Sequence, residues 1–268
     1  MIPFDLHSHC DLSFDGESTA AEMTERALEL GMKYYALTDH IEVNVFYDGE
    51  YRCDRTEERA AALLPELKRE YSDRLTLLYG VELGQAVHNR ELAQRLLRDN
   101  KYDFVIGSCH MVRGYDDFYF LDYNEHDPVK LLDIYFEELL ETAEWDGFDV
   151  MAHLTYPLRY ICGDYKKEID MSRFDAVTDK IFLTLVKNGK GLEINTSGLR
   201  QSIACLLPEE KYIRRYYELG GRILTIGSDA HKTSDLGKGI AEGIAAAKSA
   251  GFKEIAVYLD REPRFIGI

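Results

Sequence analysis

Short apolar segments alternate with longer amphipathic segments along the whole chain, and this rhythm limits the possible folds more than any other feature. It is typical of α/β proteins, in which helices cover a mostly parallel sheet. The predicted strands span residues 3–6, 34–38, 76–81, 104–107, 149–152, 191–194, 223–226 and 254–259. The predicted helices span residues 19–30, 56–71, 90–98, 128–145, 173–188, 208–219 and 240–250.

The chain has 268 residues, a length that suits one α/β barrel. No internal repeat, low-complexity tract or linker marks a second domain, so we expect residues 1–268 to form a single domain. Two stretches fit no regular element, namely 41–54 and 111–127, and both are rich in Tyr, Phe and Asp. Loops of this length in a compact domain are usually functional, often as lids over a site. Their aromatic side chains, including Phe46, Tyr47, Tyr51 and those from Tyr115 to Phe120, are candidates for closing over a substrate.

No apolar run approaches the roughly 20 residues that would span a bilayer. Residues 1–6 lead directly into a polar stretch and do not resemble a secretory signal. The five cysteines are odd in number and contain no Cys-x-x-Cys pair, which indicates reduced thiols. We therefore expect a soluble protein located in the cytoplasm.

The charge is strongly negative, with 32 basic and 48 acidic side chains and a formal net charge of −16. This balance argues against binding to long nucleic acids or to anionic membranes. An anionic substrate would need local positive charge, which divalent cations and a few arginines can supply.

Histidines gather at one kind of position. Six of the eight lie just past the carboxyl end of a predicted strand, namely His7, His9, His40, His110, His153 and His231. Three carboxylates lie in comparable places, namely Glu82, Asp229 and, in the loop after the first strand, Asp15. In an α/β barrel all these strand ends open onto one face, where active sites are built.

The combination of imidazole and carboxylate ligands suits Zn, Mn or Fe. Residues two apart in an extended segment point to the same side, so each His-x-His or Asp-x-His pair can bind one metal centre or two adjacent ones. Nine candidate ligands are too many for one ion and indicate two or three divalent cations. We expect Asp39 to orient His40, His88 and His126 to be solvated, and Cys10 and Cys109 to be packing residues rather than nucleophiles.

Two arginines stand beyond the candidate ligands. Arg159 follows His153, and Arg200 follows the sixth predicted strand. A guanidinium group binds phosphate oxygens through two parallel hydrogen bonds. This placement favours a phosphate ester as substrate, with surface ion pairs as the alternative role.

The motifs His7-x-His9, Thr38-Asp39-His40, Gly107-Ser108-Cys109-His110 and Asp229-x-His231 resemble those of the polymerase and histidinol phosphatase (PHP) superfamily. Together with the segments 153–160 and 193–200, they are most similar to the monofunctional histidinol-phosphatases. The resemblance covers nearly the whole chain and implies a distorted (β/α)7 barrel with a trinuclear metal centre. It implies one metal at His7, His9, Glu82 and Asp229, a second at Glu82, His110 and His153, and a third at Asp15, His40 and His231. Some members have a histidine at the position of Asp15, and the carboxylate favours harder ions.

The resemblance implies hydrolysis of L-histidinol phosphate to L-histidinol and inorganic phosphate. Glu82, His153, Arg159 and Arg200 would take part in catalysis, and Arg159, Arg200, Asn195 and Ser197 would contact the substrate. One alternative is a PHP phosphoesterase that acts on nucleotides or another small phosphate ester. A metal-dependent amidohydrolase and a non-catalytic metal-binding protein are further alternatives. The sequence does not specify the oligomeric state.

Overall fold

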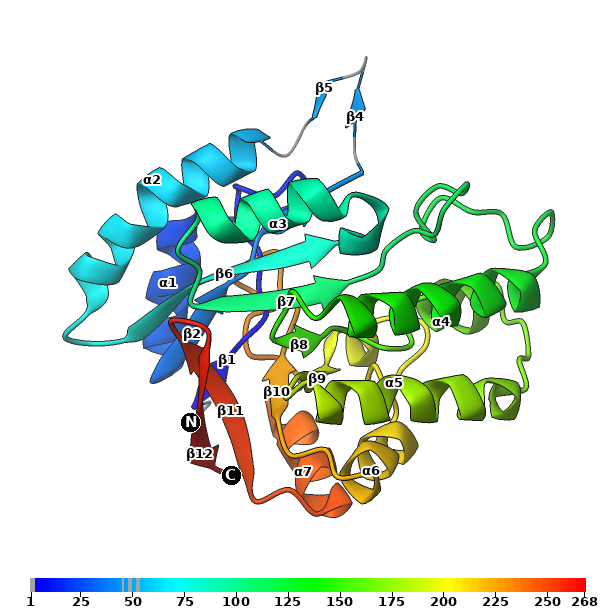
Figure 1. Cartoon of the computed structure of the whole chain (residues 1–268). Helices are drawn as coiled ribbons and strands as arrows, with labels where there is room; N and C mark the ends of the chain where they lie inside the picture. Colours follow the sequence, from blue (N-terminus) through cyan, green and yellow to red (C-terminus); the bar gives the residue numbers. More distant parts are fainter. Residues whose placement is uncertain (1–2, 45, 48–49, 52–53) are drawn as a thin grey trace.

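In the described part of the chain, seven parallel strands form the wall of a barrel in the order β1–β2–β6–β7–β8–β9–β10. The computed structural model describes residues 3–44, 46–47, 50–51 and 54–268 (Figure 1). The end strands β1 and β10 are joined by a hydrogen bond from Leu6 N to Ile226 O and by a bridge between Ser8 and Ala230. The predicted distorted (β/α)7 barrel is therefore confirmed. The wall strands are β1 (Phe4–Asp5), β2 (Tyr34–Leu37), β6 (Thr76–Gly84), β7 (Phe104–Ser108), β8 (Val150–Met151), β9 (Gly191–Asn195) and β10 (Leu224–Gly227).

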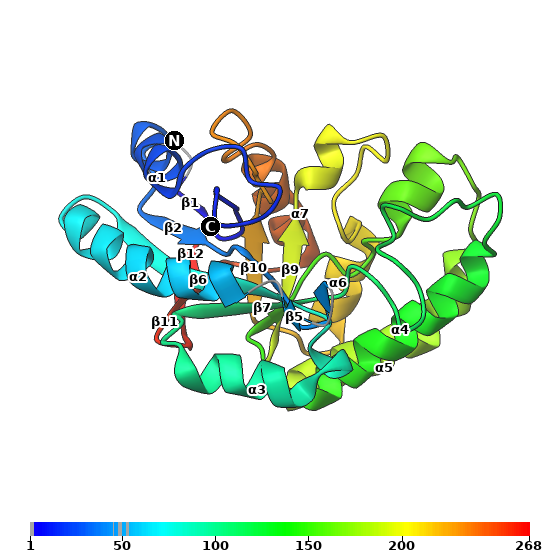
Figure 2. The same ribbon diagram turned by 90° about the horizontal axis from the view of Figure 1, so that it is seen from above.

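The described residues form seven α-helices. Figure 2 shows that the helices lie outside the strands. The predicted ends agree with the observed ones to within about two residues, because local signals mark them. Thr19 and Glu22 form a capping box at the start of α1, and Asp127 caps α4 ahead of Pro128. The helices are α1 (Ala20–Glu29), α2 (Asp54–Tyr71), α3 (Arg90–Asp99), α4 (Pro128–Trp145), α5 (Asp175–Lys187), α6 (Glu210–Glu218) and α7 (Ile240–Ala250).

Strand pairing is interrupted briefly after β2 and resumes in β3 (His40–Glu42). Both segments pair with β6 in one register, since Leu37 lies opposite Tyr79 and His40 opposite Glu82. The prediction that residues 41–54 form no regular element is thus wrong for the end of β3. It is also wrong for the short antiparallel strands β4 (Phe46–Tyr47) and β5 (Glu50–Tyr51). The predicted role of the aromatic side chains in this loop falls outside the described part of the structure.

The last predicted strand does not join the barrel wall. β11 (Glu254–Leu259) pairs antiparallel with β12 (Glu262–Gly267), because Asp260 and Arg261 have positive φ of 52° and 66° and form a tight two-residue turn. Tyr258 stacks on Phe104 at the start of β7, and Arg261 pairs with Asp149, 2.6 Å away, just before β8. The hairpin therefore covers the end of the barrel where the strands begin.

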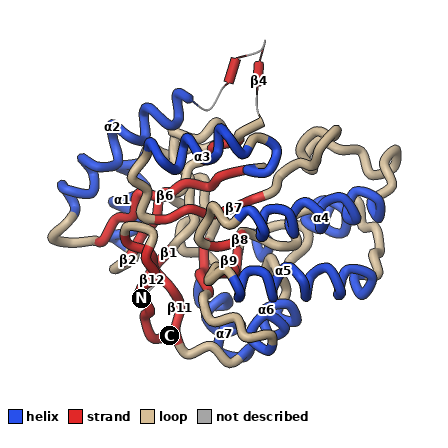
Figure 3. The backbone as a smooth tube through the Cα atoms, in the orientation of Figure 1, coloured by secondary structure: helices blue, strands red, loops and turns tan. Residues whose placement is uncertain are grey.

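The opposite end of the barrel carries the long connections. Figure 3 shows the loop between β7 and α4 extending beyond the strands. Within the described residues, no helix combines the length and apolar character needed to cross a membrane.

Candidate metal centre

All nine candidate ligands come together where the wall strands end. Seven of the side chains are buried, and the exposed fraction is 0% for His7 and His9, 1% for Glu82 and 8% for Asp229. His231 and Asp15 are more accessible, at 27% and 38%. The cluster is therefore a deep site with one open side.

Glu82 lies at the middle of the cluster. Its Oε2 atom is 3.2 Å from His7 Nε2, 3.4 Å from His9 Nε2 and 3.0 Å from His40 Nδ1. Its Oε1 atom is 3.1 Å from His110 Nε2 and 2.9 Å from His153 Nε2. Each oxygen thus faces a different group of histidines, which is the arrangement expected of a bridging carboxylate.

Asp15 lies at the open side of the cluster with two further histidines. Its Oδ2 atom is 3.1 Å from His231 Nε2 and 3.6 Å from His40 Nε2. The ring of His9 stacks against both His40 and His231, with centroid distances of 4.1 and 4.2 Å. Asp229 Oδ1, 3.3 Å from His9 Nε2, links this side to the buried part.

Among the described residues, four groups hold ligand atoms within 4.8 Å of one another. One of them, His7 with His9 and Glu82, contains three of the four ligands of the first set implied by the family resemblance, and another, Glu82 with His110 and His153, matches the second set. The others place His40 with His9 and His231, and His40 with Glu42 and His110. The third implied set is supported by the separations from Asp15 given above.

The positions of the protons on the histidine rings indicate whether these residues fit divalent cations. His7 Nδ1 lies 2.5 Å from Glu193 Oε1, and His110 Nδ1 lies 2.9 Å from Glu42 Oε1. A carboxylate accepts the ring N–H on that side, so each Nε2 atom faces the cluster and presents a lone pair there unless it carries a second proton.

These lone pairs face other acceptors at close range. His7 Nε2 is 3.1 Å from His9 Nε2, and His110 Nε2 is 3.3 Å from His153 Nε2. Such neighbours repel unless a proton or a cation lies between them. A tetrahedral ion with bonds of about 2.0–2.1 Å sets its ligand atoms roughly 3.4 Å apart, close to the spacing found here. Glu82 Oε2 and His40 Nδ1 are also buried and near each other without hydrogen-bond geometry. The donor set therefore fits divalent metal ions.

The electrostatics agree with a site built for cations. Burial alone would lower the pKa of His110, but Glu42 and Glu82 outweigh it and raise that pKa to about 10. Burial likewise disfavours the Glu42 carboxylate, yet the neighbouring His110 and His40 lower its pKa to about 2. His7 follows the same pattern, with burial opposed by Glu193, Glu82 and Asp229, so its pKa lies well above the usual value. In the metal-free cluster His7 and His110 therefore hold protons, whereas burial, His40 and His231 lower the pKa of His9 to about 3.

Sequence reasoning missed Glu42 and Glu193, which orient the histidines from behind. Both are buried, and Glu193 also accepts a hydrogen bond from His153 N. The available signal was an acidic residue within an otherwise apolar strand segment, as in Gly191-Leu192-Glu193-Ile194. Gly84 has a related role, because a Cβ atom there would lie 1.9 Å from the Glu42 carboxylate.

Two predictions about polar residues near the cluster are wrong. Asp39 accepts hydrogen bonds from Cys10 N, Ser13 N and Ser13 Oγ, and so holds the loop after His9 rather than the ring of His40. Ser13 Oγ in turn accepts from His40 N. His88 is not solvated, since its ring contacts Glu138 at 2.5 Å and its side chain is 8% exposed. Cys10 is buried against Asp39, in keeping with the predicted packing role.

The two arginines lie at the edge of the cluster. Arg159 Nη2 donates to Ser197 Oγ at 2.8 Å and lies 3.4 Å from Asp229 Oδ2. Arg200 Nη2 donates to the carbonyl oxygens of Ser228 and Asp229. Within the described structure, Arg159 Nε and Arg200 Nη1 are buried donors without a hydrogen-bond partner. Each arginine thus keeps donor capacity beside the candidate ligands.

Asn195 and Ser197, predicted to contact substrate, are buried beside Asp229. Asn195 Nδ2 and Ser197 Oγ lie 3.3 and 3.2 Å from Asp229 Oδ2. These contacts orient a candidate ligand, and contact of either residue with a substrate stays a prediction.

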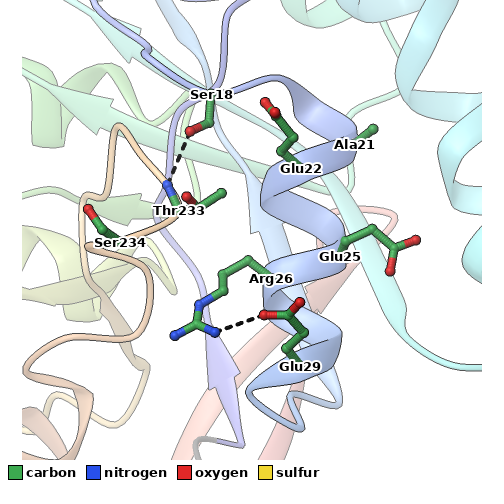
Figure 4. A pocket seen from close by; sticks show the side chains of 8 residues that line it. All are labelled: Ser18, Ala21, Glu22, Glu25, Arg26, Glu29, Thr233 and Ser234. Atoms are coloured by element: carbon green, nitrogen blue, oxygen red, sulfur yellow. Dashed lines mark hydrogen bonds and ion pairs between the residues drawn. The ribbon is translucent and has the colours of Figure 1, made fainter.

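A surface hollow of 610 Å³ lies elsewhere, between α1 and the segment after β10 (Figure 4). Its lining includes Glu22, Glu25 and Glu29, which are solvated, and Arg26, which pairs with Glu29 at 2.8 Å. None of the candidate ligands lines it. The presence of a hollow therefore does not identify the site, whereas the chemistry of the histidine cluster does.

Comparison with known proteins agrees with this geometry. The chain is 29% identical over 266 residues to a probable histidinol-phosphatase of Thermotoga maritima, covering 94% of each protein. It is 24% identical to a histidinol-phosphatase of Lactococcus lactis, covering 96% of this chain and 95% of the relative. A crystal structure of the histidinol phosphate phosphatase from Lactococcus lactis, complexed with Zn, L-histidinol and phosphate, shares the fold. Its TM-score is 0.83 at 22% identity, over 98% of this chain and 99% of that one. The PHP domain model matches residues 5–197, and the chain therefore belongs to the PHP domain family.

Proposed function

We propose that this chain is a metal-dependent phosphomonoesterase that hydrolyses L-histidinol phosphate to L-histidinol and inorganic phosphate. The observation that carries the proposal is the cluster of six histidines and three carboxylates around Glu82. The named relatives align with the chain over nearly its full length, which favours this substrate over other phosphate esters.

The proposed cofactors are two or three divalent cations, with Zn, Mn or Fe as candidates. His7, His9, Glu82 and Asp229 would hold one, and Glu82, His110 and His153 a second. Asp15, His40 and His231 would hold a third, at the more exposed side. Bound there, such ions supply Lewis acidity and lower the pKa of water towards neutrality.

The protein side chains supply orientation and charge. Glu193 and Glu42 hold the rings of His7 and His110 in the tautomer that presents Nε2. Asn195 and Ser197 hold Asp229. Because these partners are buried, the ligands are positioned before substrate arrives, which reduces reorganisation during the reaction.

Arg159 and Arg200 are the proposed phosphate-binding residues. The guanidinium groups lie beside Asp229 from two different loops, and each has a buried N–H without a partner among the described residues. A phosphate with equatorial oxygens near these donors would satisfy them and gain charge-assisted hydrogen bonds. They would stabilise the charge that redistributes in the transition state.

The same proposal includes a cytoplasmic location, a single domain and a small-molecule partner, without nucleic acid or membrane. In support, the described cysteines are free thiols, as in a reducing compartment. The buried apolar residues form one cluster from Phe4 to Tyr258. The net charge of −16 disfavours polyanions.

A panel of phosphate esters tests the substrate. We expect kcat/KM for L-histidinol phosphate to exceed that for p-nitrophenyl phosphate and for nucleoside monophosphates at least about a hundredfold, because a specific pocket adds differential transition-state binding. Element analysis of protein purified without added metal belongs in the same experiment. Comparable rates on a nucleotide would favour the alternative PHP phosphoesterase, and no hydrolysis of any ester by metal-loaded protein would favour a non-catalytic role.

A further inference from the structure

The segment after β7 folds back on itself beside the metal centre. His110 O accepts a hydrogen bond from Phe118 N at 3.0 Å, Met111 bridges to Asp117, and Tyr115 N donates to Val112 O in the turn. This hairpin fixes Asp117 next to the candidate ligand His110. The position of Asp117 is therefore tied to the metal centre by backbone hydrogen bonds.

The Asp117 carboxylate has neutral partners. Its Oδ1 atom accepts from Tyr119 N at 2.7 Å and lies 3.2 Å from the hydroxyl of Tyr156. The Tyr156 ring contacts His110 and His153, with both centroid distances at 5.0 Å. Among the described residues, no lysine, arginine or histidine forms an ion pair with Asp117, and its side chain is only partly buried. Asp117 is thus a half-buried carboxylate that borders the site without an ion-pair partner within 4 Å among the described residues, and His110 interacts with it only at longer range.

The other described carboxylates around the cluster already have partners of their own. Glu82 lies among the histidines, Glu193 and Glu42 hold His7 and His110, and Asp39 holds the loop at Ser13. Asp117 differs because it is followed, away from the metal centre, by the aromatic side chains of Tyr156, Tyr160 and Tyr119. The Tyr156 hydroxyl is 3.1 Å from that of Tyr160, whose ring meets the exposed ring of Tyr119 edge to face.

The proposed substrate carries a cation that must lie close to the metals. In L-histidinol phosphate the ammonium-bearing carbon is separated from the ester oxygen by a single methylene group. A phosphate held at the metal centre therefore brings the ammonium to its immediate border, and the imidazole extends further out. A half-buried carboxylate there gains a charge-assisted hydrogen bond from an ammonium.

We propose that Asp117 binds the α-ammonium group of the substrate and makes the enzyme specific for amino-alcohol phosphates. The inference rests on the proposed function and extends it by naming the residue that selects the substrate. Tyr156 and the backbone of Tyr119 hold the carboxylate in place, and the rim of Tyr160 and Tyr119 borders the path of the imidazole.

The experiment compares two substrates in matched variants. The substrates are L-histidinol phosphate and its desamino analogue, imidazolylpropyl phosphate. Asp117→Asn keeps the shape and an acceptor for Tyr119 N–H while removing the charge. We expect kcat/KM for L-histidinol phosphate to fall about 100-fold, as for other lost half-buried charge pairs, and kcat/KM for the analogue to change less than about threefold. Asp116→Asn, at an exposed neighbour in the same loop, should leave both values unchanged.

Two further measurements separate the possible outcomes. Metal content shows whether the variant has disturbed His110, and L-histidinol as an inhibitor of p-nitrophenyl phosphate hydrolysis reports ammonium binding without turnover. An equal loss on both substrates, or no loss on either, would overturn the role of Asp117 while leaving the proposed function intact. Wild-type protein that hydrolyses p-nitrophenyl phosphate, but neither turns over L-histidinol phosphate nor is inhibited by L-histidinol, would overturn both.

Discussion

At the scale of single residues, Glu82 joins the two halves of the buried cluster. One oxygen faces His7, His9 and His40, and the other faces His110 and His153. If the negative charge of Glu82 were removed, the two groups of histidines would lose the carboxylate that lies between them. The centre therefore depends on this side chain more than on any peripheral ligand.

We expect Glu82→Gln to lower the metal content and to reduce phosphatase activity to background. The amide keeps the volume but supplies only one good acceptor, so it cannot bridge two ions with charge. Metal analysis and kcat on the same preparation check this. Glu144→Gln, at an exposed position of α4, is the matched control, and full occupancy with full activity in Glu82→Gln would refute the bridging role.

Arg159 and Arg200 require a comparison at fixed metal content, because both also contact Asp229. We expect either Ala variant to keep its metals and to lose roughly 10²–10³-fold in kcat, as for other lost charge-stabilising donors. A Lys replacement keeps the charge but lacks the planar fork, so it should recover only part of the loss. Inorganic phosphate should inhibit each Ala variant less than the parent. An unchanged inhibition constant in both would mean that the arginines form only protein contacts.

At the scale of elements, the register between β3 and β6 decides how His110 is held. Glu42 at the end of β3 lies opposite Gly84 at the end of β6, and only a residue without a side chain leaves room for its carboxylate. The pairing of β3 with β6 therefore places a carboxylate behind His110, although His110 itself belongs to neither strand. Gly227 at the end of β10 similarly leaves room for His7, since a Cβ atom there would lie 2.2 Å from His7 Cβ.

We expect Gly84→Ala to displace Glu42 and to weaken metal binding about 10–100-fold, as for other losses of a partner behind a metal-bound histidine. The barrel should still fold, because the substitution adds one methyl group at a strand end. Gly267→Ala in β12, where a Cβ atom meets nothing within 4 Å, is the control. Metal affinity from competition with a chromophoric chelator provides the measurement, and equal affinities in both variants would contradict this role for Glu42.

At the scale of the whole molecule, metal binding is coupled to protons. The pKa of His110 is raised to about 10 in the metal-free protein, so this ring is protonated at neutral pH. A metal ion needs the deprotonated nitrogen and must displace that proton. Metal binding at pH 7 therefore releases protons, and the metal affinity increases as the pH rises towards 10.

Calorimetric titration of metal-free protein with Zn²⁺ at pH 7, in two buffers of different ionisation enthalpy, measures the release. We expect the apparent enthalpy to depend on the buffer, with more than one proton released per molecule, since the pKa values of His7 and His40 are also raised. His126→Ala, whose ring lies outside the cluster, should behave like the parent, and His110→Ala should release fewer protons. Identical enthalpies in both buffers would contradict the coupling.

Much of this protein was determined by local sequence. The alternation of apolar and amphipathic segments predicted helices around a mostly parallel sheet, and the family resemblance implied the (β/α)7 barrel. The caps at Thr19 and Asp127 marked helix starts. The candidate ligands were also accessible from sequence. Parallel strands all run in one direction, so side chains that follow them meet at one end whatever the detailed packing.

Only the tertiary structure decided which groups meet behind and beside the ligands. Glu193 reaches His7 across 186 positions of the sequence, Asp39 turned towards Ser13 instead of His40, and Asp117 came next to His110 through a hairpin turn. The segment 254–259 is the strand that was predicted, but it pairs with β12 in a hairpin at the far end instead of joining the barrel wall. The spacing of apolar residues in the sequence reports on contacts between residues a few positions apart. The contacts behind the ligands depend instead on strand register and on turns that bring distant segments together. Neither of these produces a repeating pattern of residues in the sequence.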